Sequence, residues 1–521
     1  MSATSPVISP YPIRSVLTGA QRSSPAPLFV IIAMFMVLCV PLAAYLNIWQ
    51  DEAYSLHTTS GGLTYALQQG LGFEAQAPLY FVMLAAWRDV NTSAFFARLL
   101  SIVFSIGTLM ATWAFVRRYI STINSGFILA AVAFNPFTVW AAVEIRPYAA
   151  VIMLSAVLSL LFFVGFLDER PGRAARIAYL CVAIAGTYTQ YYVAFLIPAH
   201  LFVLIMLRQW ASAKHLLISG SLLGLSLVPL AIILPQQFQS YHAFAVAFKI
   251  PSYAMATVLL GYPFPHGWID TWAHQPLQNT FYLFVALVPF ALGAGYLKQL
   301  RATTKALLLM LIALFAMYTS VIVITHVQVI IPRHTLVMLV PLLLGCFALI
   351  GDVVRPQRSL VLASYATIYL LFAGFSLWHD FHGLSKVGDW QRVSNFVAGA
   401  ARPGDGIALF NAEAELPFRY YFARTIPVTP IPRTISFQEF DEQRFVLHSN
   451  ADVANSLGHF AAKHRHIWLV ESEACEPKSY AFFGCHFLAE YVRAQFTTVN
   501  TVKFNGTTVL ELKHSTSQAR L

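Results

Sequence analysis

The chain has 521 residues, of which 58% are hydrophobic and 11% are charged, and its formal net charge at pH 7 is +10. Soluble globular proteins contain about 45–50% apolar and about 25% charged residues. The composition therefore excludes a disordered chain, a collagen-like fibre and an ordinary cytosolic enzyme, and it predicts a membrane protein. No basic segment interleaved with aromatic residues occurs, so we expect no nucleic-acid partner.

The distribution of charge predicts three parts. Residues 1–27 are polar and rich in Ser and Pro, which indicates a flexible tail. Residues 28–379 consist mainly of apolar runs of 17–22 residues, each long enough to cross a hydrocarbon layer of about 30 Å. Residues 380–521 carry 14 Lys and Arg against 14 Asp and Glu, which is typical of a soluble domain.

The apolar runs predict about eleven transmembrane helices, the first a retained signal anchor. They are 28–46, 95–116, 124–142, 147–167, 174–190, 191–208, 215–235, 281–297, 306–325, 334–351 and 359–379. The apolar stretch from Pro78 to Trp87 is too short to cross the bilayer, so we expect a juxtamembrane helix at the interface. Gly61 to Gly72 is predicted to form a second, amphipathic helix that lies flat on the membrane.

Loop charges predict the orientation. One side of the membrane receives 14 Lys and Arg against 3 acidic residues, whereas the short loops on the other side carry 5 against 6. The positive-inside rule places the first side in the cytoplasm. We therefore expect a multi-pass protein of the cell (inner) membrane, with a cytoplasmic N-terminus and a periplasmic or extracellular C-terminal domain.

The C-terminal domain is predicted to be α/β. Gly406 to Phe410 and His466 to Val470 are short apolar strand candidates, and helical patterns occur near 412–424 and 451–464. Val499 to Leu512 alternates around Asn505-Gly506, a strong hairpin signal. Cys475 and Cys485 lie ten residues apart in a compartment that permits oxidation, so a disulfide is expected, with two unpaired thiols as the alternative.

Three acidic residues lie at the ends of the first external loop. Asp51 and Glu52 directly follow the first span, and Glu74 precedes the short apolar stretch. Carboxylates at a bilayer surface are suited to accept a proton from a hydroxyl group that arrives from water. The alternative is that they are interfacial charges that face the solvent.

Three external arginines form the complementary set. Arg98 opens the second span, Arg146 lies between the third and fourth, and Arg333 precedes His334 at the start of the tenth. Guanidinium groups bind phosphate in a bidentate manner, although they also reach out to lipid headgroups. Three arginines beside an acidic loop indicate a phospholipid-like substrate.

These residues fall into motifs whose order and spacing resemble those of the GT-C superfamily, specifically the protein-mannosyltransferase-like membrane glycosyltransferases of family 39. The motifs are Asp51-Glu52-Ala53-Tyr54, Glu74 to Tyr80, Arg98-Leu99-Leu100-Ser101, Pro136-Phe137 with Glu144 to Ala149, and Arg333-His334. The resemblance covers most of residues 28–425.

The resemblance implies a polyprenyl-phosphate sugar as donor and transfer outside the cytoplasm with inversion at the anomeric carbon. The acceptor would be a glycan, a lipid or a protein, as in protein glycosylation or lipopolysaccharide modification. Asp51 would be the general base and Glu74 would assist it. The residues with assigned roles are Asp51, Glu52 and Glu74 for catalysis, and Arg98, Arg146, Arg333, Tyr54, Tyr80, Tyr148 and His334 for substrate binding.

The motifs depart from the family at two histidines, because Gln76 and Gln190 stand where the family has His. Glu74 also stands where the family has Asp, and Ala77 where it has Pro. The spacing of four external histidines (His242, His266, His274, His326) fits no compact metal-ligand pattern. We assign no metal ligand, and a divalent metal stays an open alternative.

Two other classes of protein fit parts of the sequence. A transporter or lipid flippase would combine many spans with broken helices or charges in mid-membrane. A sensor or assembly factor would bind a partner through the C-terminal domain and use the spans as an anchor.

Overall fold

The computed structural model describes residues 24–120, 124–241, 289–291, 293, 295–325, 332–353, 358–438, 441–477 and 479–515. They form two compact units. The first contains the described residues up to Ala43 and those from Gln76 to Asp380. The second combines Ala44–Ala75, from the predicted first external loop, with the described residues from Phe381 onward. The predicted domain boundary at residue 380 stays a prediction.

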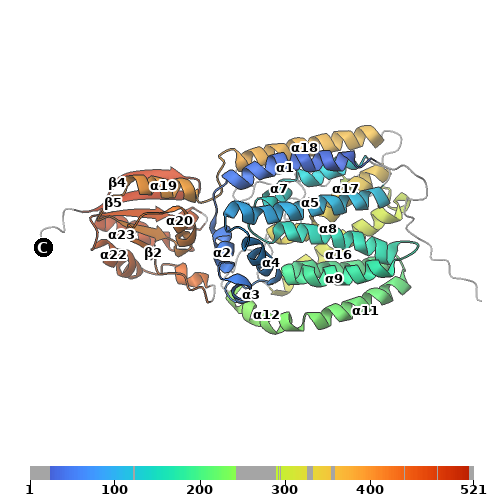
Figure 1. Ribbon diagram of the computed structural model, residues 1–521, viewed down its shortest axis with the longest axis horizontal. Helices are drawn as coiled ribbons and strands as arrows, with labels where there is room; N and C mark the ends of the chain where they lie inside the picture. Colours follow the sequence, from blue (N-terminus) through green and yellow to red (C-terminus); the bar gives the residue numbers. More distant parts are fainter. Residues whose placement is uncertain are drawn as a thin grey trace, which may run out of the picture. The chain divides into compact units, whose positions relative to one another are not determined.

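The first unit is helical, and its long helices run roughly along one direction as a bundle (Figure 1). Its α-helices are α1 (Ala26–Tyr45), α4 (Leu79–Arg88), α5 (Ala94–Tyr119), α6 (Ser125–Ala133), α7 (Pro136–Ala142), α8 (Tyr148–Phe162), α9 (Arg173–Thr189), α10 (Leu196–Met206), α11 (Trp210–Ser226), α12 (Val228–Tyr241), α16 (Ala302–Thr325), α17 (Leu339–Val353) and α18 (Arg358–Phe381). Shorter helical turns are η2 (Phe163–Leu167), η3 (Tyr191–Phe195), η4 (Leu297–Gln299) and η5 (Pro332–Met338).

Among the described residues, six helices are long and apolar enough to cross a membrane, or up to eight if each of two bent pairs is one span. The bent pairs are α6 with α7, at 56°, and α11 with α12, at 60°. The polytopic, mainly helical fold is therefore confirmed, whereas the count of eleven stays a prediction. Most of the predicted span 281–297 lies outside the described residues, as do the four external histidines and most of the tail 1–27.

The two short helices expected around the first external loop are present. The predicted helix at Gly61 to Gly72 is α3 (Gly62–Leu71), and the stretch from Pro78 to Trp87 forms α4. Tyr80, Phe81 and Leu84 of α4 are fully buried. Ten residues span only about 15 Å, which agrees with a helix that does not cross the bilayer.

A five-stranded sheet in the order β2-β1-β3-β5-β4 organises the second unit. Its strands are β1 (Gly406–Phe410), β2 (Val428–Ile431), β3 (His466–Glu471), β4 (Phe496–Phe504) and β5 (Thr507–His514). β1 pairs in parallel with β2 and β3, and β5 pairs antiparallel with β3 and β4. All five residues of β1 are buried, as expected for a central parallel strand. The strands and the hairpin around Asn505-Gly506 are confirmed.

Helices cover both faces of the sheet because strand side chains alternate between them (Figure 1). Ile407 and Leu409 face one core, which includes residues of α19 (Trp390–Ala400) and α20 (Glu415–Tyr421). Ala408 and Phe410 face the other core. The remaining helical elements are η6 (Ala412–Ala414), η7 (Glu442–Phe445), α21 (Asn450–Val453), η8 (Ala454–Gly458), α22 (His459–Ala461), η9 (Glu473–Cys475) and α23 (Cys485–Gln495).

The second core also contains side chains from the first external loop. Tyr54 of α2 (Gln50–Thr58) and Phe73 belong to it, with ring centroids 5.2 Å apart. A disulfide joins Cys475 to Cys485, whose Cα atoms are 5.6 Å apart, at the edge of the same core. The loop that carries the predicted catalytic acids thus packs in the α/β unit.

Candidate active site

Helix α2 presents Asp51 in its first turn. The backbone N–H of Trp49, the residue before the helix, donates to Oε2 of Glu52 over 3.4 Å, which closes the helix start. Acidic residues in a first turn are also stabilised by the helix dipole. Glu52, Tyr54 and Ser55 are buried, whereas Asp51 is only partly buried. The helix is therefore fixed on several sides and keeps Asp51 accessible.

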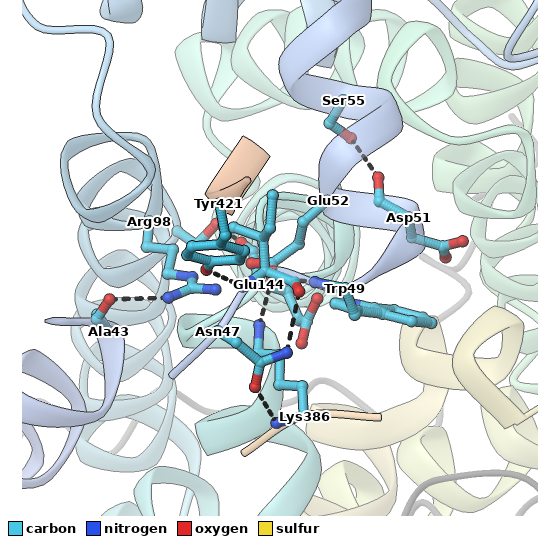
Figure 2. A network of polar contacts seen from close by, with 12 residues as sticks. Ala43, Asn47, Trp49, Asp51, Glu52, Ser55, Arg98, Glu144, Lys386 and Tyr421 are labelled. Atoms are coloured by element: carbon cyan, nitrogen blue, oxygen red, sulfur yellow. Dashed lines mark hydrogen bonds and ion pairs between the residues drawn. The ribbon is translucent and has the colours of Figure 1, made fainter. Parts of the chain in front are cut away.

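Glu52 forms a buried ion pair with Lys386. The distance from Nζ of Lys386 to Oε2 of Glu52 is 2.9 Å, and the two side chains are 8% and 0% exposed. The backbone N–H of Lys386 donates to Oδ1 of Asn47 over 2.7 Å, so the lysine is fixed to the loop at two points (Figure 2). Tyr421 adds a third connection between the C-terminal residues of this unit and the loop, because its hydroxyl accepts from the backbone N–H of Ile48 over 2.7 Å.

Tyr54 is held by a buried polar cluster at the carboxyl ends of β1 and β3. Its hydroxyl donates to Oε1 of Glu413 over 3.0 Å, and Nδ2 of Asn411 donates to Oε2 of the same carboxyl group over 3.0 Å. The backbone N–H of Asn411 donates in turn to Oγ of Ser472 over 3.1 Å. Burial raises the pKa of Glu413 to about 7, although hydrogen bonds from Asn411 and Tyr54 oppose that shift.

Glu74 lies at the other end of α2. The hydroxyl of Thr58, the last residue of the helix, donates to Oε1 of Glu74 over 3.1 Å. Thr58 is seven residues after Asp51, which corresponds to about 10 Å of helix. Asp51 therefore lies at the start of α2, Glu74 contacts the end of the same helix, and Tyr54 lies between these two points. The negative charges of Glu413, Asp51 and Glu74 each contribute to raising the pKa of Tyr54, after the larger effect of burial.

In the first unit, Arg98 and the connection between α7 and α8 lie together. Nη1 of Arg98 donates to the backbone carbonyl of Ala43 over 2.9 Å. Ser101, one turn further along α5, donates from Oγ to the carbonyl oxygen of Glu144 over 2.6 Å. Arg98, Glu144 and Arg146 are 1%, 0% and 6% exposed. Charged side chains buried in a membrane protein commonly mark function, because burying them is costly.

The remaining predicted binding residues surround the start of α8 and η5. The ring of Tyr148, the first residue of α8, stacks on Trp140 with centroids 4.8 Å apart. The ring of His334, in η5, stacks on Tyr192 at 4.9 Å. Oγ of Ser155 in α8 donates to the carbonyl of Val337, which fixes η5 against the helix that Tyr148 opens. Arg333 adjoins His334 and is partly buried.

The structure thus groups the predicted site residues in two sets. Asp51, Glu52, Tyr54 and Glu74 belong to the α/β unit. The helical unit holds the others, which are Tyr80, Arg98, Arg146, Tyr148, Arg333 and His334. The sequence interpretation missed Lys386 and Glu413, because charged residues in a soluble domain are usually solvated. Within the described ranges, no group of three or more His, Cys, Asp and Glu side chains is arranged to hold a metal ion.

Comparison with solved structures identifies the fold. A crystal structure of ArnT from Cupriavidus metallidurans in the apo state matches with a TM-score of 0.57 and 12% identity, over 94% of this chain and 98% of that chain. A second ArnT structure from this organism, bound to undecaprenyl phosphate, matches with a TM-score of 0.53 and 13% identity over the same shares. No protein-family model and no curated protein sequence matches the chain. The predicted GT-C fold is therefore confirmed.

Proposed function

We propose that the chain is a membrane glycosyltransferase that moves a sugar from a polyprenyl-phosphate donor to an acceptor hydroxyl on the outer side of the cytoplasmic membrane. The chain shares its fold with ArnT over nearly the whole length of both proteins, and one of those ArnT structures contains undecaprenyl phosphate. The observation that carries the proposal is the position of Asp51. It stays partly accessible on a short helix whose next four residues are buried.

The proposed reaction needs one base and a site for phosphate. Asp51 accepts the proton of the acceptor hydroxyl while the hydroxyl oxygen bonds to the anomeric carbon. The bond between that carbon and the phosphate oxygen breaks, and the polyprenyl phosphate leaves with the electron pair. Because attack and departure take place on opposite sides of the carbon, the configuration inverts. A phosphate leaving group is stable as an anion, so no general acid is required.

The arginines supply the phosphate site in this proposal. Arg98 and Arg146 are both buried in the helical unit, and Glu144, two residues before Arg146, accepts at its backbone carbonyl from Ser101 on the helix that carries Arg98. Arg333 adds another positive charge. Guanidinium groups bind phosphate oxygens through two parallel hydrogen bonds and stay ionised in a protein interior. Tyr80, Tyr148 and His334 are proposed to contact the lipid or the sugar.

The roles of the acids follow from their contacts. Glu52 is fully buried and paired with Lys386, so we assign it to positioning rather than to proton transfer. Glu74 accepts from Thr58 at the far end of α2 and is proposed to fix that end of the helix. Asp51 remains the residue suited to act as general base.

The experiment is a transfer assay on the full chain in lipid nanodiscs. A panel of undecaprenyl-phosphate sugars is supplied together with an extract of cell-envelope acceptors, and products are identified by mass spectrometry. Asp51→Asn is expected to lower transfer by about 10²–10⁴-fold, the range for loss of a general base. Asp89→Asn, an exposed acid that follows α4, is the matched control and should transfer as the wild type does. Unchanged transfer by Asp51→Asn would refute the proposed base.

The transporter alternative draws on the two bent helix pairs. At the bend between α6 and α7, Asn135 uses both ends of its amide within the protein. Oδ1 accepts from the backbone N–H of Phe137 over 2.9 Å, and Nδ2 donates to the hydroxyl of Tyr369 over 2.7 Å. This bend is therefore stabilised internally, and the preference for the enzyme rests on the fold that the chain shares with ArnT. Movement of the donor lipid across the bilayer without formation of a new glycoside would favour the transporter instead.

A further inference from the structure

We propose that the C-terminal α/β domain controls the reaction by fixing the orientation of α2 about its own axis. Lys386 and Glu413 are the positioning residues for Asp51. This inference rests on the proposed function for its catalytic consequence, but the contacts themselves are independent of it. Both contacts lie in one compact unit, between the first external loop and residues more than 300 positions later in the chain.

The first step concerns the direction of the two contacts around α2. Successive residues of an α-helix are about 100° apart. Glu52 therefore lies about 100° to one side of Asp51, and Tyr54, three residues on, about 60° to the other side. Lys386 binds the first of these residues and Glu413 the second. Two contacts on opposite sides of Asp51 prevent rotation in either direction, and Figure 2 shows the Asp51 side chain directed away from Glu52.

The second step concerns the rigidity of Lys386. The backbone N–H of Gly388 donates to the carbonyl of Asn505 over 2.8 Å, and the hydroxyl of Thr507 donates to the carbonyl of Gly388 over 2.8 Å. Nδ2 of Asn505 also donates to Oγ of Ser385 over 3.3 Å. The turn of the β4–β5 hairpin thus holds the residues on both sides of Lys386. A lysine on a flexible linker would lack this support.

The third step concerns the cluster that holds Tyr54. The carboxyl ends of adjacent parallel strands are the edge at which open α/β sheets usually bind ligands. Asn411 follows β1 and Ser472 follows β3, so these residues and Glu413 occupy that edge. Here the group bound at the edge is the side chain of Tyr54, which is 5% exposed and donates to Glu413. The edge at which open α/β sheets usually bind ligands therefore holds a helix of the same chain in this domain.

The consequence for catalysis follows from geometry. A displacement of about 1 Å in a reacting group can cost on the order of 100-fold in rate. A small rotation of α2 would move the Asp51 carboxylate by such a distance without changing the arginines of the helical unit. Loss of either contact should therefore lower kcat and leave the affinity for the donor lipid unchanged.

The test is hydrogen exchange measured by mass spectrometry on the full chain in nanodiscs, combined with transfer kinetics. In Lys386→Met, the amides of 50–58 are expected to exchange about tenfold faster or more, because a buried carboxylate loses its partner. The amides of β1 and β3 should keep their protection. Glu413→Ala, which removes the acceptor of the Tyr54 hydroxyl, should accelerate exchange in the same segment by a smaller factor. Lys463→Met and Glu490→Gln, at exposed positions of the same domain, are the matched controls.

A double variant distinguishes the loss of positioning from the cost of leaving a buried charge without its ion pair. The double variant Glu52→Gln with Lys386→Met leaves no buried unpaired charge, so it should recover most of the protection lost in Lys386→Met. In Lys386→Met, kcat should fall about 10–100-fold while the KM for undecaprenyl-phosphate sugar stays within about twofold of wild type.

Three results would overturn the inference: wild-type exchange over 50–58 in Lys386→Met, equal loss of protection in β1 and β3, or wild-type kcat in spite of faster exchange. Failure of the proposed function gives a different pattern, in which Asp51→Asn transfers normally or the wild type transfers nothing. In that case faster exchange confined to 50–58 would still support the positioning contacts.

Discussion

The hydroxyl of Tyr54 donates a 3.0 Å hydrogen bond to Glu413, a residue 359 positions later in the chain, and both side chains are buried. The phenol is the donor because the pKa of Tyr54 lies well above its ordinary value, chiefly through burial and further through the charge of Glu413. Glu413 accepts this bond in its neutral and in its ionised form. Its state of protonation therefore affects stability without breaking the contact.

This relationship predicts a pH dependence of stability. The pKa of Glu413 is raised from 4.5 to about 7, so the folded state binds this proton more tightly than the unfolded state. The resulting stabilisation is fully present below about pH 4.5 and is lost as the pH rises to about 7. Glu413→Gln stays neutral at every pH. Relative to wild type, the variant should therefore gain stability between pH 5 and pH 8, by up to about 3 kcal/mol.

The measurement is thermal unfolding of the purified chain at pH 5, 6, 7 and 8. Burial also raises the pKa of Glu471 to about 7, so the stability of wild type and of the variant shares a dependence on pH that comes from Glu471. Only the difference in stability between the two proteins therefore reports Glu413. Glu490→Gln, at an exposed position of the same domain, is the control for the change of one carboxylate to an amide. A difference between Glu413→Gln and wild type that is constant from pH 5 to pH 8 would contradict the assignment.

The arginines predict a separation of binding from turnover. Arg146→Lys and Arg333→Lys keep the positive charge but lose the planar pair of donors that binds phosphate. We expect the KM for the polyprenyl-phosphate donor to rise about tenfold, which corresponds to about 1.4 kcal/mol, with a smaller change in kcat. Steady-state kinetics at saturating acceptor measure both. Arg465→Lys, at an exposed position of the α/β unit, is the control, and an unchanged KM in both variants would exclude these arginines from the phosphate site.

The disulfide predicts the redox environment of the C-terminal domain. Cys475 and Cys485 close a loop with a separation of ten residues, and such a cross-link stabilises a fold by about 2–3 kcal/mol. Cys485→Ser should lower the free energy of unfolding by about that amount, and wild type treated with a reducing agent should behave like the variant. Cys181→Ser removes an exposed thiol of the helical unit and should have no such effect. Protein isolated from cells with both thiols alkylated would contradict an extracytoplasmic domain.

The fold could be predicted largely from local patterns. The apolar strand Gly406–Phe410 and the hairpin at Asn505-Gly506 are given by runs of a few residues, and both are present with nearly the predicted bounds. The break between α6 and α7 was not predicted, although Asn135 before Pro136 is a helix-start signal inside the apolar run. The run 124–142 is long enough for one span, so its length concealed the bend.

The positioning contacts could not be predicted in the same way. Lys386 pairs with Glu52 across more than 300 residues, and no local pattern records which distant charge a buried carboxylate will meet. Only the structure shows that Gly388 and Asp389 both have positive φ angles and that the backbone N–H of Gly388 donates to Asn505. That geometry fixes the linker, so Lys386 is held in place to pair with the buried carboxylate of Glu52.

The last prediction concerns the hairpin turn that supports the residues on both sides of Lys386. Gly506 has a φ of +74°, and a Cβ atom there would approach Cγ1 of Val387 to 2.9 Å and the backbone N of Gly388 to 3.2 Å. Gly506→Ala should therefore destabilise the fold by about 1–3 kcal/mol, through the left-handed backbone and the close contact. Because the displaced residues follow Lys386 directly, exchange over 50–58 should also increase and kcat should fall.

A matched glycine with the opposite expectation is the control. Gly399 lies in α19, and a Cβ atom there would meet nothing within 4 Å, so Gly399→Ala should stabilise the helix by up to about 1 kcal/mol and leave kcat unchanged. Gly506→Asn separates the two costs at the turn, because Asn tolerates a positive φ but still carries a Cβ. If Gly506→Asn loses as much kcat as Gly506→Ala, the contact with Val387 transmits the effect to Lys386. Wild-type kcat in Gly506→Ala, with the expected loss of stability, would show that the hairpin supports the domain without positioning α2.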